Sequence, residues 1–125
     1  MKKNRILVVD DNIKIARALK MQLEHTGRFE VLAETSSRAA LNAVRSFHPE
    51  MAILDVMMPD MDGGELNYQL HQIPELQLMP TLFLTAAKLQ GERNDKELII
   101  AKPVEIAQIV RLIDQQLNPA AQPTA

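Results

Sequence analysis

Short apolar runs alternate along the chain with longer segments in which apolar residues recur at helical spacing. Five runs predict buried strands, at residues 6–9, 30–33, 51–54, 81–84 and 98–101. In most of the segments between them, apolar positions recur every three or four residues, which is typical of a helix with one face packed against a sheet. The regular alternation of strand and helix therefore predicts an α/β domain built around a parallel sheet.

Polar caps and prolines mark the expected ends of the first two helices. We expect the first helix to begin near Asn12 and to end before Gly27. The second should begin at Ser36 or Ser37 and stop before Pro49. Asn and Ser accept hydrogen bonds from the free N–H groups of a first turn, whereas Gly and Pro commonly follow a last turn.

The later segments differ in length. We expect the third helix to stop before Pro74 and the last helix to begin after Pro103 and run to Leu117. Between the fourth and fifth strands only residues 85–97 are available, and a parallel crossover with its helix needs at least ~10–12 residues. We therefore expect at most one or two helical turns there, near residues 86–90, so that the fourth helix is short or absent.

Length and charge limit the classes of protein to consider. A chain of 125 residues predicts one domain, which we place at residues 1–118. Residues 119–125 are rich in proline, alanine and polar residues, and we interpret them as a disordered tail or a truncated linker. The formal net charge of −2 and the lack of a basic run argue against direct binding to nucleic acid or to a membrane.

The chain contains no cysteine, which excludes a disulfide scaffold, cysteine catalysis and thiolate metal sites. Its first apolar run is four residues long, too short for a secretion signal. None of its apolar runs approaches the ~18 residues of a membrane span. We therefore expect a cytoplasmic protein.

Polar residues that carry chemistry follow four of the five predicted strands. They are Asp10 and Asp11 after the first, Asp55 after the third, Thr85 after the fourth and Lys102 after the fifth. The carboxyl ends of parallel strands share one edge of a sheet, where open α/β folds bind their ligands. Two carboxylates ~4 Å apart repel by about 4 kcal/mol at an effective dielectric near 20. A lysine and a hard cation such as Mg²⁺ would relieve that repulsion.

These residues resemble the receiver domain of two-component response regulators over nearly the whole chain, from Arg5 to about Leu117. Each motif is weak alone, but their order and placement are specific. They are Asp10-Asp11, Asp55 followed by Met58-Pro59 and Met61-Asp62-Gly63, Thr85-Ala86, and Lys102-Pro103. The resemblance implies a CheY-like, doubly wound five-stranded parallel sheet in the flavodoxin-like order 2-1-3-4-5.

The resemblance also implies the reaction. Asp55 would be the phosphoacceptor, taking a phosphoryl group from a sensor histidine kinase or a histidine phosphotransfer protein. Asp10, Asp11 and Asp55 would hold Mg²⁺ together with the backbone carbonyl of Met57. Such a domain is a signalling switch rather than an enzyme, because it catalyses only its own phosphorylation and dephosphorylation.

By the same resemblance, the Thr85 hydroxyl and the Ala86 N–H would bind phosphoryl oxygens. Lys102 would pair with Asp55 before phosphorylation and with the phosphoryl group afterwards. Pro103 would hold the Lys102 loop. A cis peptide bond between the two residues is one way to do so, although the general preference of peptide bonds favours trans.

Other polar residues near these motifs have simpler interpretations. We expect Asp60 and Asp62 to be turn and cap residues rather than ligands, and Gly63 to supply backbone freedom before the third helix. We expect the three histidines to be surface or capping residues: His25, His48 and His71.

Two departures from the family pattern leave a second function open. Typical receivers carry an aromatic residue three positions before the lysine, where this chain has Ile99, and the crossover before it is short. A receiver-like binding module that works without phosphorylation is therefore an alternative. A Mg²⁺-dependent phosphatase of the haloacid-dehalogenase type is a weaker one, because its second aspartate would fall on Met57.

Overall fold

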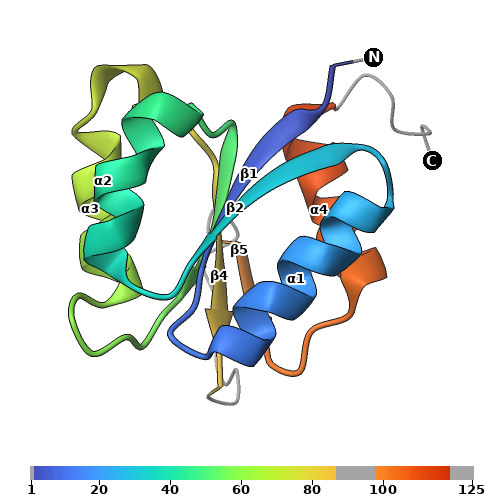
Figure 1. Cartoon of the computed structure of the whole chain (residues 1–125), viewed down its shortest axis with the longest axis horizontal. Coiled ribbons are helices and arrows are strands. Elements are labelled where there is room, and N and C mark those ends of the chain that lie inside the picture. The colour runs from blue at the N-terminus through green and yellow to red at the C-terminus, as the bar shows by residue number, and fades with distance from the viewer. Residues whose placement is uncertain (1, 87–97, 119–125) are drawn as a thin grey trace.

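A computed structural model describes residues 2–86 and 98–118 and shows five parallel strands in one sheet (Figure 1). The strands are β1 (Asn4–Val9), β2 (Phe29–Glu34), β3 (Met51–Asp55), β4 (Thr81–Thr85) and β5 (Leu98–Ala101). Their order is β2-β1-β3-β4-β5, and all four neighbouring pairs are parallel. This confirms the fold expected from the sequence.

Helices cover both faces of the sheet. They are α1 (Ile13–His25), α2 (Ser37–Phe47), α3 (Gly63–His71), the short 3-10 helix η1 (Pro74–Leu76) and α4 (Ile106–Leu117). Helices α1 and α4 pack on one face, and α2 and α3 pack on the other (Figure 1). The sheet is therefore doubly wound, as expected.

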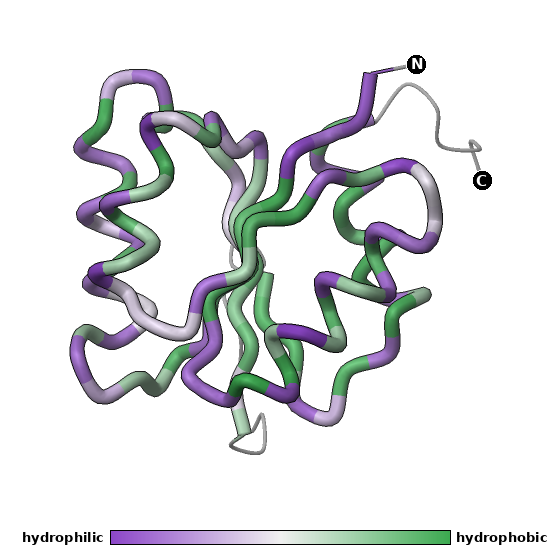
Figure 2. The backbone as a smooth tube through the Cα atoms, in the orientation of Figure 1, coloured by the Kyte–Doolittle hydropathy of each residue, from purple (hydrophilic) through white to green (hydrophobic). Residues whose placement is uncertain are grey.

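Each face of the sheet has its own apolar core. Successive residues of a strand point to opposite faces, so Ile6 and Val8 pack with α1 and α4 while Leu7 and Val9 pack with α2 and α3. The continuous apolar colour of the central strands in Figure 2 reflects burial on both sides. The rigid sheet between the two cores holds its carboxyl ends in place.

The first two helices start at the expected caps. The Asn12 side chain accepts the N–H groups of Lys14 and Ile15, and the Ser36 hydroxyl accepts the N–H of Ala39. Gly27 follows α1 with φ +79°, a conformation that glycine adopts without steric conflict.

The end of the third helix differs from the expectation. Helix α3 ends at His71, and Pro74 is the first residue of η1 rather than a simple stop. Proline is well suited to that position because a first turn leaves its N–H groups without helical partners. Four of the five residues expected to form helical turns, 87–90, and the tail at 119–125 lie outside the described residues.

The three histidines lie at helix ends, away from the acidic residues. His25 is the last residue of α1, and His48 follows α2 with φ 57°; both are exposed. His71 ends α3, and its two ring nitrogens lie 2.8 Å from the Asn67 carbonyl oxygen and 2.7 Å from the Met79 carbonyl oxygen. Among the described helices, none is long and apolar enough to cross a membrane.

Candidate functional site

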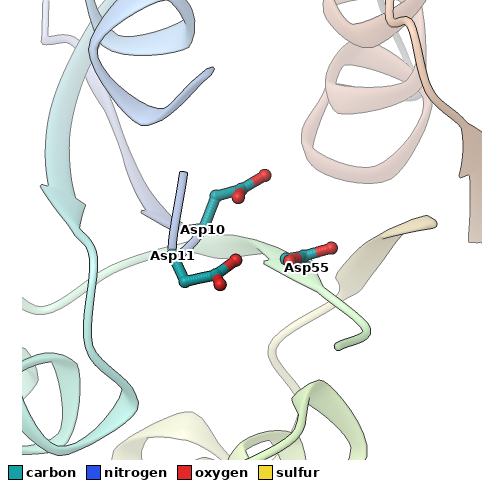
Figure 3. A group of neighbouring side chains, drawn as sticks. All are labelled: Asp10, Asp11 and Asp55. Atoms are coloured by element: carbon teal, nitrogen blue, oxygen red, sulfur yellow. The ribbon is translucent and has the colours of Figure 1, made fainter. Parts of the chain in front are cut away.

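Three carboxylates meet at the carboxyl edge of the sheet (Figure 3). Asp10 follows β1 and Asp55 ends β3, and these two strands are neighbours in the sheet. One carboxylate oxygen from each of Asp10, Asp11 and Asp55 lies within 4.8 Å of the others. Asp10 is completely buried and Asp55 is 4% exposed, whereas Asp11 faces solvent. The strand order thus assembles the acidic cluster that the sequence predicted.

Lys102 reaches the same cluster from the end of β5. Its backbone N–H donates to the Thr85 carbonyl oxygen at 2.8 Å, which continues the pairing of β4 with β5. Its Nζ lies 2.9 Å from Asp10 Oδ2 and 3.2 Å from Asp55 Oδ1. One ammonium group therefore bridges carboxylates from two different strands.

The pKa values of Asp55 and Lys102 both shift upward, for different reasons. Burial raises the pKa of Asp55 and the neighbouring Asp10 charge raises it further, while Lys102 opposes both effects without cancelling them. Burial acts to lower the pKa of Lys102, but its contacts with Asp10 and Asp55 outweigh that effect and raise it. Lys102 is therefore firmly charged at neutral pH, and one cation faces three carboxylates.

The site fits a hard divalent cation. Asp10 Oδ2 is fully buried and, within the described part of the chain, has no hydrogen-bond partner, although the Lys102 ammonium lies close enough for an ion pair. Such an oxygen has coordinating capacity left. Three carboxylates with one exposed member suit Mg²⁺, which binds a few protein oxygens and keeps several waters.

Asn12 has a role at the site that the sequence did not indicate. Its N–H donates to Asp10 Oδ1 at 2.9 Å, and this bond orients the buried carboxylate. Its side chain caps α1, which was the only role we expected. The separation of two residues from Asp10 is the signal that could have suggested the turn, because Asp side chains often accept the N–H two residues on.

The remaining predicted site residues lie at the same edge of the sheet. Thr85 ends β4 and is 9% exposed; Ala86 follows it and is exposed. Met57 follows Asp55 by two residues, and its side chain is 76% exposed. The Lys102–Pro103 peptide bond is cis, so the expectation of a trans bond was wrong. Ile99 lies on β5 opposite Phe83 of β4, which places an aliphatic side chain where typical receivers have an aromatic.

Gly63 serves a purpose different from the expected one. The positive φ among the described glycines occurs at Gly27 and not at Gly63. A Cβ built on Gly63 would lie 2.4 Å from the Asp55 carbonyl oxygen, so a side chain does not fit there. The Gly63 N–H donates to the Val56 carbonyl at 2.9 Å. Gly63 is thus a point of close approach that lets α3 begin directly against the end of β3.

Asp60 and Asp62 are indeed capping residues. Asp62 Oδ1 accepts the N–H of Glu65 at 2.8 Å and so caps its own helix, α3. Asp60 instead accepts hydrogen bonds from Ser36 and Arg38 at the start of α2. Neither belongs to the acidic group, which among the described residues consists of Asp10, Asp11 and Asp55.

Replacing Asp55 with Asn is expected to stabilise the protein by about 1 kcal/mol at neutral pH without Mg²⁺. Two charges 4.8 Å apart repel by roughly 3 to 4 kcal/mol at an effective dielectric near 20. Asp55 has two such neighbours, and burial together with repulsion by Asp10 outweighs its attraction to Lys102, so that its pKa is raised. Urea unfolding of wild type and D55N measures the difference, and D11N, which alters an exposed carboxylate, should change stability less.

The advantage of D55N should shrink in acid. The folded wild type binds the Asp55 proton more tightly than the unfolded chain does, so its stability rises as pH falls through the raised pKa toward the ordinary value of 3.8. D55N has no such proton to bind. An advantage that stays constant or grows over this range would contradict the ionised Asp55 carboxylate as its cause.

Comparison with known families agrees with this geometry. The family described as response regulator receiver domain matches residues 6–114. The uncharacterized 14.6 kDa protein in the sodA1 3′ region of Leptolyngbya boryana is 32% identical, and the alignment covers 88% of this chain and 87% of that one. The polar-differentiation response regulator DivK of Brucella abortus is 25% identical, with 92% and 97% covered.

Solved structures with the same fold extend the similarity. A putative response regulator from Chloroflexus aurantiacus has a TM-score of 0.75 and 28% identity, covering 91% of this chain and 97% of its own. A CheY-like response regulator receiver domain protein from Methanospirillum hungatei has a TM-score of 0.80 and 24% identity, covering 94% and 96%. At that lower identity the likeness concerns the fold.

Proposed function

Because this chain belongs to the response regulator receiver domain family, we propose that it accepts a phosphoryl group on Asp55 in a Mg²⁺-dependent reaction and acts as a signalling switch. The donor would be a phosphohistidine on a sensor histidine kinase or on a histidine phosphotransfer protein. The observation that carries the proposal is the buried Asp55 carboxylate, held among Asp10, Asp11 and Lys102 at one edge of the sheet.

Asp55 would act as the nucleophile. One of its carboxylate oxygens forms a bond to phosphorus, the bond from phosphorus to the imidazole nitrogen of the donor breaks, and the electron pair stays on the imidazole. The transferred group gathers negative charge in the transition state, so the residues around it contribute by position and charge. The product is an acyl phosphate, which water can hydrolyse to reset the switch.

The neighbouring residues have distinct tasks in this scheme. Lys102 Nζ, 3.2 Å from Asp55 Oδ1, is close enough to pair with the incoming phosphoryl group once Asp55 is modified. The Thr85 hydroxyl and the Ala86 N–H, at the end of β4, would donate to phosphoryl oxygens.

Asp10, Asp11 and Asp55 would hold Mg²⁺, with the Met57 carbonyl oxygen as a further ligand. When bound, Mg²⁺ supplies positive charge that offsets the repulsion between the carboxylates and the phosphoryl oxygens. The buried Asp10 Oδ2 and the exposed Asp11 offer it oxygen ligands of the preferred kind.

The proposal predicts a single phosphoryl adduct that depends on Asp55. Wild type, D55N and E75Q are incubated with acetyl phosphate and Mg²⁺ and analysed by intact mass. Wild type and E75Q should gain one phosphoryl group, because Glu75 is an exposed carboxylate outside the acidic group. D55N should gain none, since an amide is a poor nucleophile, and a chelator should abolish the adduct in wild type.

The other outcomes identify the alternatives. Steady phosphate release without an adduct would favour a Mg²⁺-dependent phosphatase, although Met57 supplies no carboxyl group where such an enzyme needs a general acid. No adduct from acetyl phosphate or from a histidine kinase would favour a binding module that works without phosphorylation. An adduct that persists in D55N would show that Asp55 is not the acceptor.

A further inference from the structure

The loop between β3 and α3, residues 56–62, carries the Met57 carbonyl and runs beside the acidic cluster. Its first residue is fastened to the sheet, because the Val56 N–H donates to the Leu84 carbonyl oxygen at 2.8 Å. Its last residue, Asp62, caps α3. Between these ends the loop crosses to the start of α2, where a second set of contacts holds it.

Asp60 connects the middle of the loop to the first turn of α2. Its Oδ2 accepts the Ser36 hydroxyl at 3.0 Å and the Arg38 N–H at 3.2 Å. The Arg38 N–H is one of the free donors of a helix start, where a carboxylate is favoured. These contacts lower the pKa of Asp60, with the Arg38 N–H as the largest cause, so the carboxylate is ionised at neutral pH.

Ser37 adds a buried contact to the same loop. Its hydroxyl donates to the Met61 carbonyl oxygen at 2.8 Å and lies 3.7 Å from Met58 Sδ. Ser37 is completely buried and Met58 is 8% exposed. The cap and the first two residues of α2 thus contact three of the last five residues of a seven-residue loop.

The side chain of Met57 does not hold this residue in place. Its side chain is 76% exposed, so contacts of its neighbours must fix the place of its carbonyl. Val56 is held on one side, and Met58, Asp60 and Met61 are held on the other. The polar contacts described on the second side come from the start of α2, a helix that, among the described residues, contributes nothing to the acidic cluster.

We propose that Asp60 is a positioning residue for the metal site: together with Ser37 it fastens the loop to the start of α2, places the Met57 carbonyl and thereby strengthens Mg²⁺ binding. This inference rests on the proposed function, because it takes the Met57 carbonyl as a Mg²⁺ ligand. Asp60 itself does not touch the ion. It acts through the backbone, because only two residues, Met58 and Pro59, separate it from Met57.

The test measures Mg²⁺ binding to the full chain without a phosphodonor, by following the amide shifts of Asp10, Asp11 and Met57 during a MgCl₂ titration. D60A should weaken binding about tenfold, at the low end of the range for residues that orient a metal ligand. D60N keeps an acceptor oxygen and should recover most of the affinity. E65Q is the control, since Glu65 is an exposed carboxylate near the loop, and its side chain accepts a hydrogen bond from Gln69 of its own helix.

S37A provides a second, independent change. It removes the donor to the Met61 carbonyl while leaving every carboxylate in place, so a weaker Mg²⁺ affinity cannot come from lost charge. A purely structural role for Asp60 or Ser37 would lower the melting temperature but leave the Mg²⁺ dissociation constant of the folded protein unchanged.

Each outcome has a separate meaning. Weaker binding in D60A and S37A with recovery in D60N supports the inference. Wild-type affinity in D60A, or an equal loss in E65Q, overturns it and leaves the proposed function intact. Weaker Mg²⁺ binding in D60A together with failure of wild type to form the Asp55 adduct overturns the phosphoacceptor function alone. A wild type that shows no Mg²⁺-dependent shifts overturns both.

Discussion

Gly63→Ala is expected to lower the free energy of unfolding by about 3 kcal/mol, at the upper end of the range for overpacking a tight site. The added Cβ would lie 2.4 Å from the Asp55 carbonyl oxygen and 3.1 Å from both the Asp55 carbonyl carbon and Val56 Cα. All three are backbone atoms, which cannot swing aside as the end of a side chain can. The start of α3 or the end of β3 must shift, and a shift of β3 displaces Asp55.

The neighbouring glycine is a matched control. A Cβ on Gly64 would lie 3.5 Å from Asp62 Oδ1, an ordinary contact, and Ala is favoured over Gly in a helix by about 1 kcal/mol. Urea unfolding should therefore show G63A destabilised and G64A unchanged or more stable. In the acetyl phosphate assay, G63A should also form the adduct more slowly while folded. Equal stability of the two variants would contradict the close approach.

The fold could be predicted because local patterns specify its parts. Apolar runs placed all five strands, and Asn12 and Ser36 marked the starts of the first two helices. Boundaries moved by one or two residues where polar residues join the ladder: β1 begins at Asn4, because strand pairing continues past the apolar run. Parallel strands with helical crossovers leave few ways to arrange these elements.

The acidic cluster could be predicted for a related reason. Once the strand order is set, residues that follow β1 and β3 must be neighbours, so Asp10 and Asp55 had to meet. Lys102 required more, because β4 lies between β3 and β5. Its long side chain crosses that strand, and the family resemblance rather than the spacing indicated its role.

The remaining features depend on contacts between segments far apart in the sequence. Asp60 sits 24 residues after Ser36, and nothing local distinguishes a residue that caps the next helix from one that caps an earlier helix. The steric role of Gly63 depends on the path of β3, which a motif does not specify. Sequence patterns indicate which residues have a specific structural role, whereas the neighbours of each residue in space determine what that role is.

Lys102→Met is expected to lower the free energy of unfolding by about 3 kcal/mol in Mg²⁺-free buffer, since removing one partner of a buried ion pair leaves its charge uncompensated. The Lys102 side chain is 17% exposed and contacts both Asp10 and Asp55. Without it, three carboxylates remain within 4.8 Å of one another, and none of the ion pairs described for residues 2–86 and 98–118 brings another cation to them. Met keeps most of the volume of the side chain, so the change is mainly one of charge.

K102M is expected to lower the free energy of unfolding, whereas D55N is expected to raise it. Combining the two substitutions tests whether repulsion among the carboxylates causes both changes. If repulsion among carboxylates dominates, the double variant K102M/D55N should recover much of the loss, because Asp10 then faces only the exposed Asp11. Saturating Mg²⁺ should stabilise K102M more than wild type, since the ion supplies the missing charge.

Lys20→Met is the control: its pair with Glu24 is exposed, and such pairs contribute about 0–1 kcal/mol. Urea unfolding of wild type, K102M, D55N, K102M/D55N and K20M, each with and without Mg²⁺, decides between these explanations. If the free energy of unfolding of K102M is no lower than that of K20M, Lys102 does not act by neutralising the cluster. The same holds if adding D55N to K102M lowers the free energy of unfolding further.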